Sequence, residues 1–262
     1  MQVLFDLVKS FLAFFGIGII RKPRLDALID VAQQYLRLNQ SMGLLLHDEV
    51  SYENARRLSR YVAVSHSALS QDLFVLHELD FKRNGFFVEF GACDGLLGSN
   101  TLLLEQKFGW RGILAEPSKQ FQKALQRNRP DQRLDFRCVW RNSDEMLEFV
   151  EAGPLSGVVE SIGLDLRNKT HPTYSVQSVS LGDLLESHGA PKTIDYLSID
   201  TEGSELEILQ SFDFDRYDIK VITCEHNHSV SRNDIMSLLA AKGFDRRFDN
   251  ISSVDDWYIK RS

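Results

Sequence analysis

A glycine-rich loop with an acidic residue just before it follows the apolar run at residues 86–92. Its glycines are Gly91, Gly95 and Gly98, so the first two are four residues apart. In the dinucleotide-binding fingerprint this first step is two residues. Gly91 lets the backbone approach a ligand closely, and Glu89 suits a cationic amino group better than an anionic pyrophosphate. The loop therefore favours a ligand that carries an ammonium, a sulfonium and a carboxylate.

A second acid, Glu116, closes the next apolar run, residues 112–117. A carboxylate at the tip of a second strand can accept hydrogen bonds from both hydroxyls of a ribose. Taken alone, Glu116 is equally explained as a surface glutamate at a strand end. Combined with the glycine loop, it predicts binding of S-adenosylmethionine. The predicted cofactor-binding residues are Glu89, Gly91, Ala92, Gly95, Ser99, Asn100, Glu116, Pro117 and Asp200.

Acids and histidines follow two later apolar runs, 194–200 and 219–225. Asp200 and Glu225 end these runs, and His226 and His228 come next. Ligands in open α/β sheets bind outside the carboxyl ends of the strands, so we expect these side chains at one rim. An acceptor hydroxyl needs a base to remove its proton, and histidine is the usual base. The predicted catalytic residues are His226, Asp200 and His228, and the predicted rim residues are Gln71, Asp72, Glu202, Glu225 and Asn227.

The acids also allow a second way to activate the hydroxyl. Asp200 and Glu225, with Glu202 nearby, could hold Mg²⁺, which would lower the pKa of a bound hydroxyl. Charge complementarity with the start of a helix explains Glu202 equally well. Similarly, a helix start explains Gln71 and Asp72 without any ligand. A histidine base is slightly favoured over a metal site.

The elements that position these residues follow from the hydrophobic pattern. Apolar residues three and four apart predict helices from Arg24 to about Asn84. From Gly85, short apolar runs alternate with helical stretches, which predicts buried parallel strands, each followed by a helix. This alternation is typical of a doubly wound α/β sheet. The helices are expected to begin near the N-cap serines Ser99, Ser118, Ser204 and Ser231.

Two regions depart from this alternation. Residues 134–181 contain short strand-like pieces without an intervening helix, which predicts a hairpin or an extension of the sheet. The chain ends in two strand-like pieces joined by a turn at residues 250–253, which predicts an antiparallel edge hairpin. We therefore expect a helical extension at residues 1–84 and one α/β domain at residues 85–262.

Composition narrows the class of protein. The 262 residues are 43% hydrophobic and 26% charged, which excludes a disordered chain. The net charge of −7 lacks the basic field that nucleic-acid binding usually needs, so we expect no nucleic-acid partner. The three cysteines form no CxxC pair, which fits a reducing, cytoplasmic location.

An apolar segment, Val3 to Ile20, lies near the amino terminus and is followed by basic residues. Its uninterrupted apolar run of ten residues, Phe11 to Ile20, is shorter than the roughly 20 that span a bilayer. We expect an amphipathic helix docked on its own domain or on a second subunit, which is compatible with a homo-oligomer. Peripheral membrane contact through residues 3–20 is the less favoured alternative.

Four segments together resemble the FkbM family of S-adenosylmethionine-dependent methyltransferases: FFVEFGACDGLLGSNT, GILAEPS, IDYLSIDTEGSELEIL and VITCEHN. The resemblance spans residues 70–259 and is most specific in IDTEGSE. It implies a class I methyltransferase sheet of seven strands with the last one antiparallel, and O-methylation of a hydroxyl on a sugar or natural product.

By the same resemblance, particular residues acquire roles. Glu89, Gly91 and Gly95 would line the methionine end of the cofactor and Glu116 its ribose. The residues that close the site would be Asp200, Glu202, Gly203 and Glu205. The expected acceptor is thus a small molecule or glycan with a hydroxyl group. Two alternatives are a non-catalytic binding protein that retains the fold and a nucleotide-dependent oxidoreductase, which the four-residue glycine step disfavours.

Overall fold

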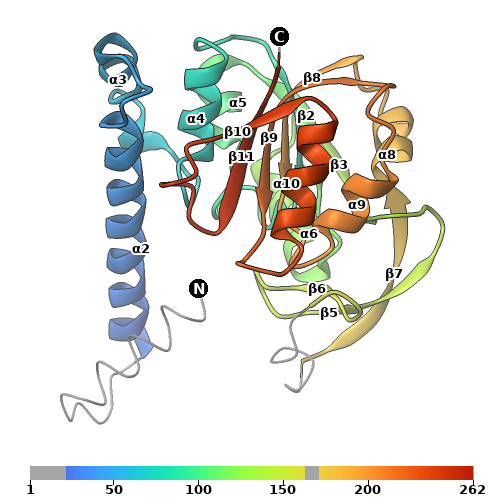
Figure 1. Cartoon of the computed structure of the whole chain (residues 1–262). Helices are drawn as coiled ribbons and strands as arrows, with labels where there is room; N and C mark the ends of the chain where they lie inside the picture. The colour runs from blue at the N-terminus through green and yellow to red at the C-terminus, as the bar shows by residue number, and fades with distance from the viewer. Residues whose placement is uncertain (1–21, 163–170, 262) are drawn as a thin grey trace.

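A seven-stranded sheet runs through the centre of the computed structural model, which describes residues 22–162 and 171–261 (Figure 1). The strand order is β10-β11-β9-β8-β1-β2-β3. The bounds of these strands are Phe86–Phe90 (β1), Arg111–Ala115 (β2), Arg133–Asp135 (β3), Thr193–Ile199 (β8), Asp218–Glu225 (β9), Phe244–Arg247 (β10) and Asp255–Lys260 (β11).

Most of this sheet is parallel. Strand β1 pairs in parallel with β2 and β8, and β8 pairs in parallel with β9. The last strand, β11, is antiparallel to both of its neighbours, β9 and β10. The predicted doubly wound α/β sheet with a carboxy-terminal antiparallel hairpin is therefore confirmed. Because β11 runs against β9, its first residues lie at the edge where the parallel strands end.

A second, four-stranded sheet has the order β4-β7-β5-β6. Its strands are Cys138–Trp140 (β4), Met146–Val150 (β5), Gly157–Val158 (β6) and Thr173–Ser180 (β7). Strands β5 and β7 pair in antiparallel fashion, so the strands predicted within residues 134–181 are present. They form this second sheet and not an extension of the central one. The loop between β5 and β6 reaches the carboxyl edge of the central sheet, where it matters for the site.

Helices cover both faces of the central sheet (Figure 1). One face packs against α8, α9 and α10 through side chains such as Leu184, Ile208 and Leu239. The other packs against α4, α5 and α6 through side chains such as Phe74 and Leu104. The helix bounds are Gln71–Glu78 (α4), Leu102–Phe108 (α5), Lys119–Asn128 (α6), Leu181–Ser187 (α8), Glu205–Ser211 (α9) and Arg232–Ala241 (α10).

The predicted helix starts are close to the observed ones, but three of the four serines do not cap as predicted. Ser118, Ser204 and Ser231 occupy the N-cap positions of α6, α9 and α10 and make no side-chain capping hydrogen bond. Helix α5 begins at Leu102, three residues after Ser99, and the Ser99 hydroxyl oxygen accepts from the Leu102 backbone N–H at 3.2 Å.

The segment before β1 is helical, as its periodicity predicts. It contains α2 (Lys22–Leu45), α3 (Tyr52–Leu58), a 3₁₀ turn at Val62–Val64 and α4. Helix α4 belongs to the core of the central sheet, since Phe74 stacks on Trp257 of β11 with ring centroids 4.8 Å apart. The predicted apolar segment 3–20 lies outside the described residues. No helix among the described residues is both long and apolar enough to cross a membrane.

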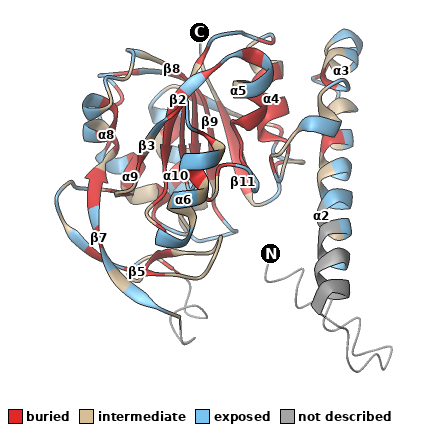
Figure 2. Cartoon of the chain, turned by 180° about the vertical axis from the view of Figure 1, so that it is seen from behind, coloured by how far each residue is buried: buried red, intermediate tan, exposed pale blue. Residues whose placement is uncertain are grey.

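Helix α2 stands at one side of the molecule and is largely exposed, in contrast to the buried sheet (Figure 2). One face of its carboxy-terminal half contacts the body of the protein. The Gln40 side chain donates to the Ile251 carbonyl, Ser41 Oγ lies 2.8 Å from Ser70 Oγ, and Leu44 is fully buried.

The close approach of β1 and β2 generates a stability prediction. A Cβ at Gly112 of β2 would lie 2.3 Å from both the ring and the carbonyl oxygen of the buried Phe87. We expect Gly112→Ala to lower the free energy of unfolding by about 1–3 kcal/mol, because neither strand can move apart freely. Urea unfolding, monitored by circular dichroism, measures this change. As a control, Gly182→Ala in α8 should cause no loss, since its nearest atoms are 4.0 Å away.

Candidate active site

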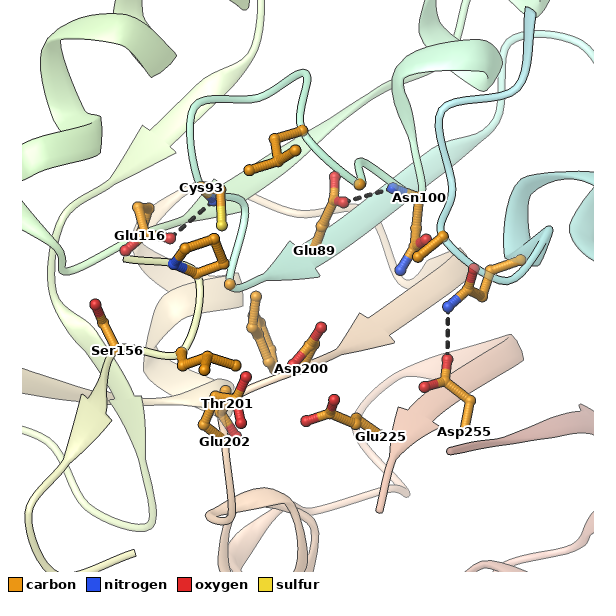
Figure 3. Close-up of a pocket in the computed structure, with 18 of the residues that line it drawn as sticks. Glu89, Cys93, Asn100, Glu116, Ser156, Asp200, Thr201, Glu202, Glu225 and Asp255 are labelled. Carbon is orange, nitrogen blue, oxygen red and sulfur yellow. Dashed lines mark hydrogen bonds between the residues drawn. The ribbon is translucent and has the colours of Figure 1, made fainter. Parts of the chain in front are cut away.

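A cavity of about 760 Å³ opens at the carboxyl ends of the parallel strands (Figure 3). Its walls come from the glycine loop after β1, the ends of β2, β8 and β9, the β5–β6 loop, the start of β11 and helix α2. This volume is in the range of small-molecule sites. It is also the position that ligands take in open α/β sheets.

Glu89, near the end of β1, holds the glycine loop against the start of α5. Its buried carboxylate accepts hydrogen bonds from the Asn100 backbone N–H at 2.8 Å and from the hydroxyls of Thr101 and Ser99. Burial raises the pKa of Glu89, and the nearby Arg129 guanidinium and these donors oppose the increase. Glu89 lines the cavity, but much of its hydrogen-bonding capacity is used within the protein.

Gly91 has a positive φ of 72°, and a Cβ there would lie 2.1 Å from the carbonyl oxygen of Asp200. A glycine is therefore required here, because the ends of β1 and β8 approach so closely. Gly91 also lines the cavity. A Cβ at Gly95, with φ 80°, would lie 2.6 Å from Arg129 Cγ. Arg129 is fully buried and donates to the Gly95 carbonyl and to Thr101 Oγ1, so it stabilises the loop from behind.

Glu116 follows β2 and lies across the cavity from the later strands (Figure 3). Its carboxylate accepts from the backbone N–H groups of Cys93 at 2.8 Å and Ser118 at 2.7 Å. Burial raises its pKa to about 7 despite these two donors. A carboxylate has about four acceptor sites, so Glu116 can still accept two hydrogen bonds from a ligand.

Asp200, Glu202 and Glu225 converge at the tips of β8 and β9. One carboxylate oxygen from each lies within 4.8 Å of the others. Desolvation by the surrounding protein raises the pKa of all three. Repulsion adds to this increase, from Glu205 and Glu89 at Asp200 and from Asp200 at Glu202 and Glu225. Glu225 Oε2 has no donor within the described structure, and the adjacent Asp200 can share a hydrogen bond only if one of the two acids is protonated. The cluster can therefore hold a proton, a divalent cation or a cationic group of a ligand.

The loop that carries Glu202 is organised by Glu205. The Glu205 carboxylate accepts from the backbone N–H groups of Thr201 and Gly203, each at 3.0 Å, and from the Thr201 hydroxyl. These bonds hold the loop that leads into α9. Gly203, at φ 115°, is needed because a Cβ there would lie 2.6 Å from the Ser161 carbonyl oxygen. Glu205 thus shapes the site without lining it.

A fourth acid of this rim, Asp255, is absent from the residues predicted from sequence. It is buried at the start of β11, and its Oδ2 accepts from Gln71 Nε2 at 2.7 Å (Figure 3). Burial and the neighbouring Asp200 raise the pKa of Asp255 to about 8. The available signal was its position at the first residue of an antiparallel strand, which begins at the edge where the parallel strands end.

The two predicted histidines do not line the cavity. The His226 side chain is buried, with Nδ1 accepting from the His228 backbone N–H at 3.0 Å and Nε2 3.7 Å from Asp256 Oδ1. Asp256 is engaged by Arg232 on the same side. Because the ring points to this network, the structure disfavours His226 as the base and leaves the acids in contact with the cavity.

The predicted site residues divide into those that line the cavity and those that do not. Ser99 and Asp72 make internal hydrogen bonds, Ser99 to Glu89 and Asp72 to Ser65 and Ser67. The predicted residues that line the cavity are Gln71, Glu89, Gly91, Asn100, Glu116, Pro117, Asp200, Glu202, Glu225 and Asn227. Those that do not are Asp72, Ala92, Gly95, Ser99, His226 and His228.

Several residues at or next to the rim have a backbone conformation that residues other than glycine rarely adopt. Positive φ angles occur at Cys93 (48°), Glu202 (58°), Asn227 (44°), His228 (55°) and Ser253 (62°). Such conformations cost free energy and persist where the surrounding structure holds them, often at functional sites. Sequence reasoning missed Ser253 and residues 153–158 of the β5–β6 loop and β6, because neither motif nor periodicity marks them. It also missed Cys93, although this residue lies within the glycine-loop segment.

The charges of the cavity indicate what it can bind. Seven acids line it: Glu89, Asp94, Glu116, Asp200, Glu202, Glu225 and Asp255. In addition, the buried Oδ1 of Asn100 has no donor within the described structure. Acceptors without donors fit a ligand that supplies N–H and O–H groups and positive charge. S-adenosylmethionine, with its ammonium, sulfonium and ribose hydroxyls, has this chemistry.

The match to a family model agrees with this interpretation. The methyltransferase FkbM domain matches residues 89–246, more than half of the chain. No curated protein matches the chain in sequence. Among solved structures, the TehB-like SAM-dependent methyltransferase from Corynebacterium glutamicum is 10% identical, with a TM-score of 0.40 over 80% of this chain and 97% of that one.

Two further solved structures are similar to the same extent. The human methyltransferase 10 domain containing protein is 12% identical, with a TM-score of 0.40 over 73% of this chain and 79% of that one. The METTL16 methyltransferase domain is 13% identical, with a TM-score of 0.40 over 72% of this chain. This chain covers 64% of the METTL16 domain.

The raised pKa of Asp255 predicts a pH-dependent stability. The folded state favours protonated Asp255. The contribution of this residue to the free energy of unfolding is therefore fully present below its unfolded pKa near 4, and it is lost as the pH rises to about 8. We expect Asp255→Asn, which cannot ionise, to stabilise the ligand-free protein increasingly from pH 5 to 8, by at most about 1.4 kcal/mol per pH unit. Urea unfolding across this range measures it. In the control Asp131→Asn, at an exposed position, the free energy of unfolding should vary with pH as it does in the parent. A stability difference between Asp255→Asn and the parent that does not change with pH would contradict the prediction.

Proposed function

The chain belongs to the FkbM methyltransferase family, and on this premise we propose that it transfers the methyl group of S-adenosylmethionine to a hydroxyl of a sugar or natural-product acceptor. The family supports the methyl donor. The observation that carries the proposed acceptor chemistry is the group of carboxylates, Asp200, Glu202 and Glu225, that faces the cavity opposite Glu116.

The residues on the Glu116 side would hold the methyl donor. Glu116 would accept hydrogen bonds from the two ribose hydroxyls with the acceptor sites that Cys93 and Ser118 leave free. Asn100 Oδ1 would accept from the ammonium group. When bound, S-adenosylmethionine supplies a methyl carbon that is electrophilic because of its positively charged sulfur.

The acids at the strand tips would activate the acceptor. An alkyl hydroxyl is a weak nucleophile until a base removes its proton. Asp200 would accept that proton as the oxygen forms its bond to the methyl carbon and the carbon–sulfur bond breaks, with the bonding electron pair passing to sulfur. Burial and the neighbouring acids raise the pKa of Asp200, which brings its basicity closer to that needed at neutral pH.

Mg²⁺ held by Asp200, Glu202 and Glu225 is the alternative way to activate the hydroxyl. The three oxygens are close enough to share an ion, and magnesium prefers carboxylate ligands. The same closeness is explained by protons shared among acids that burial has made less acidic. We therefore favour the carboxylate base, and dependence on chelator separates the two.

A small-molecule or glycan acceptor fits the charge of the site better than a nucleic acid. The chain has a net charge of −7, and the cavity wall is rich in acids. A polyanion would be repelled by both. Neutral hydroxylated compounds meet no such repulsion and can donate hydrogen bonds to the acids.

One prediction of this proposal concerns the ribose. We expect Glu116→Ala to weaken S-adenosylmethionine binding at least about tenfold, because two hydrogen bonds to a charged acceptor are lost. Isothermal titration calorimetry measures the Kd, and Glu116→Gln, which keeps the shape, checks that the loss does not arise from unfolding. The exposed Glu148→Ala should bind like the parent.

Three results would count against this assignment or against the proposed reaction. A Kd for Glu116→Ala within threefold of the parent would mean that the carboxylate does not meet the ribose. Binding of NADH more tightly than S-adenosylmethionine would favour an oxidoreductase. A protein that binds S-adenosylmethionine but transfers no methyl group to any hydroxylated acceptor would be a binding protein that retains the fold.

A second prediction separates the candidate bases. With an acceptor found by screening, we expect Asp200→Asn to lower the rate about 100-fold or more, and the parent's rate to rise with pH as Asp200 loses its proton. His226→Ala should cost little, because its ring does not face the cavity. A large loss of rate in His226→Ala, with an unfolding curve like that of the parent, would instead identify His226 as the base. Abolition of turnover by chelator and its recovery with magnesium would establish the metal.

A further inference from the structure

Arg37, on α2, is the one arginine or lysine among the described residues that line the cavity. It lies three, four and seven residues before Gln40, Ser41 and Leu44, which anchor α2 to the body of the protein. Residues at these spacings share one face of a helix. Arg37 therefore lies on the anchored face, in the wall of the cavity, and is half-buried.

No carboxylate in the described part of the chain forms an ion pair with Arg37, although seven acids line the same cavity. Its neighbour is instead His66, which also lines the cavity and interacts with the Leu96 backbone. Burial, followed by the positive charge of Arg37, lowers the pKa of His66 and keeps this ring neutral at pH 7. Within the described part of the chain, Arg37 thus has no acidic partner, and like Leu96 of the glycine loop it neighbours His66.

This position matches one end of the methyl donor. With the ribose at Glu116 and the methyl group facing the acids at the strand tips, the amino-acid portion would lie along the glycine loop. That portion carries the donor's single anionic group, a carboxylate, which the seven acids would repel. A guanidinium binds a carboxylate through paired, charge-assisted hydrogen bonds.

We propose that Arg37 binds the carboxylate of the methionine portion of S-adenosylmethionine, so that α2, outside the family match at residues 89–246, completes the donor site. This inference rests on the proposed use of S-adenosylmethionine as methyl donor. It assigns to the amino-terminal helix a specific role in binding, which the family match does not cover.

The test compares two ligands that differ only in this group. S-adenosylmethionine and decarboxylated S-adenosylmethionine are titrated into the full chain, its Arg37→Met variant and an Arg60→Met control, with calorimetry as the readout. Arg60 is exposed and outside the cavity. We expect Arg37→Met to raise the Kd of S-adenosylmethionine about tenfold or more and to leave that of the decarboxylated ligand within twofold. Arg37→Lys, which keeps the charge, should recover part of the affinity.

Each other outcome decides against the proposal. Equal losses for both ligands would show that Arg37 acts through the shape of the cavity, and unchanged affinity for both would show that it does not contact the donor. Unchanged donor affinity with a raised KM for an anionic acceptor would place Arg37 at the acceptor. If the unaltered chain binds neither ligand, the proposed methyl donor itself is wrong.

Discussion

Crowding of carboxylates around one cavity is the constraint on which the rest of the site depends. Negative charge in a partly buried place must be offset by protons, by donors or by a cationic ligand. The protein uses the first two internally: Glu89 and Glu205 are satisfied by backbone N–H groups, and burial raises the pKa values of the acids at the strand tips. The acceptor sites that remain face the cavity and favour a ligand with positive charge and hydroxyl groups.

The acids also divide into those that build the site and those that face its ligand. Glu89 and Glu205 each organise a loop that follows a parallel strand, so removing either would disturb the backbone that carries residues of the cavity wall. Glu116, Asp200 and Glu225 keep open acceptor capacity toward the cavity. The same residue type thus performs structural and chemical tasks, and only the hydrogen-bond partners of each carboxylate distinguish them.

Two segments outside the repeating strand–helix pattern complete the cavity. The antiparallel strand β11 brings Asp255 to the rim because its first residue lies where β9 ends. Helix α2 contributes Arg37, and it is held by the contacts of Gln40 with Ile251, just before β11, and of Ser41 with Ser70. The parallel sheet therefore provides one side of the site, and the two ends of the chain provide the other. Helix α4 links them, since Gln71 binds Asp255.

Local pattern by itself determined the alternating strands and helices, the carboxy-terminal hairpin and the glycine loop with Glu89 and Glu116, because each depends on neighbours in sequence. It also placed Asp200, Glu202 and Glu225 at one rim, since parallel strands end at one edge. Tertiary structure alone decided that His226 turns toward Asp256, that Asp255 joins the acids and that α2 lines the cavity. These depend on side-chain direction and on contacts between distant segments, such as residue 40 with residue 251, which no periodicity encodes.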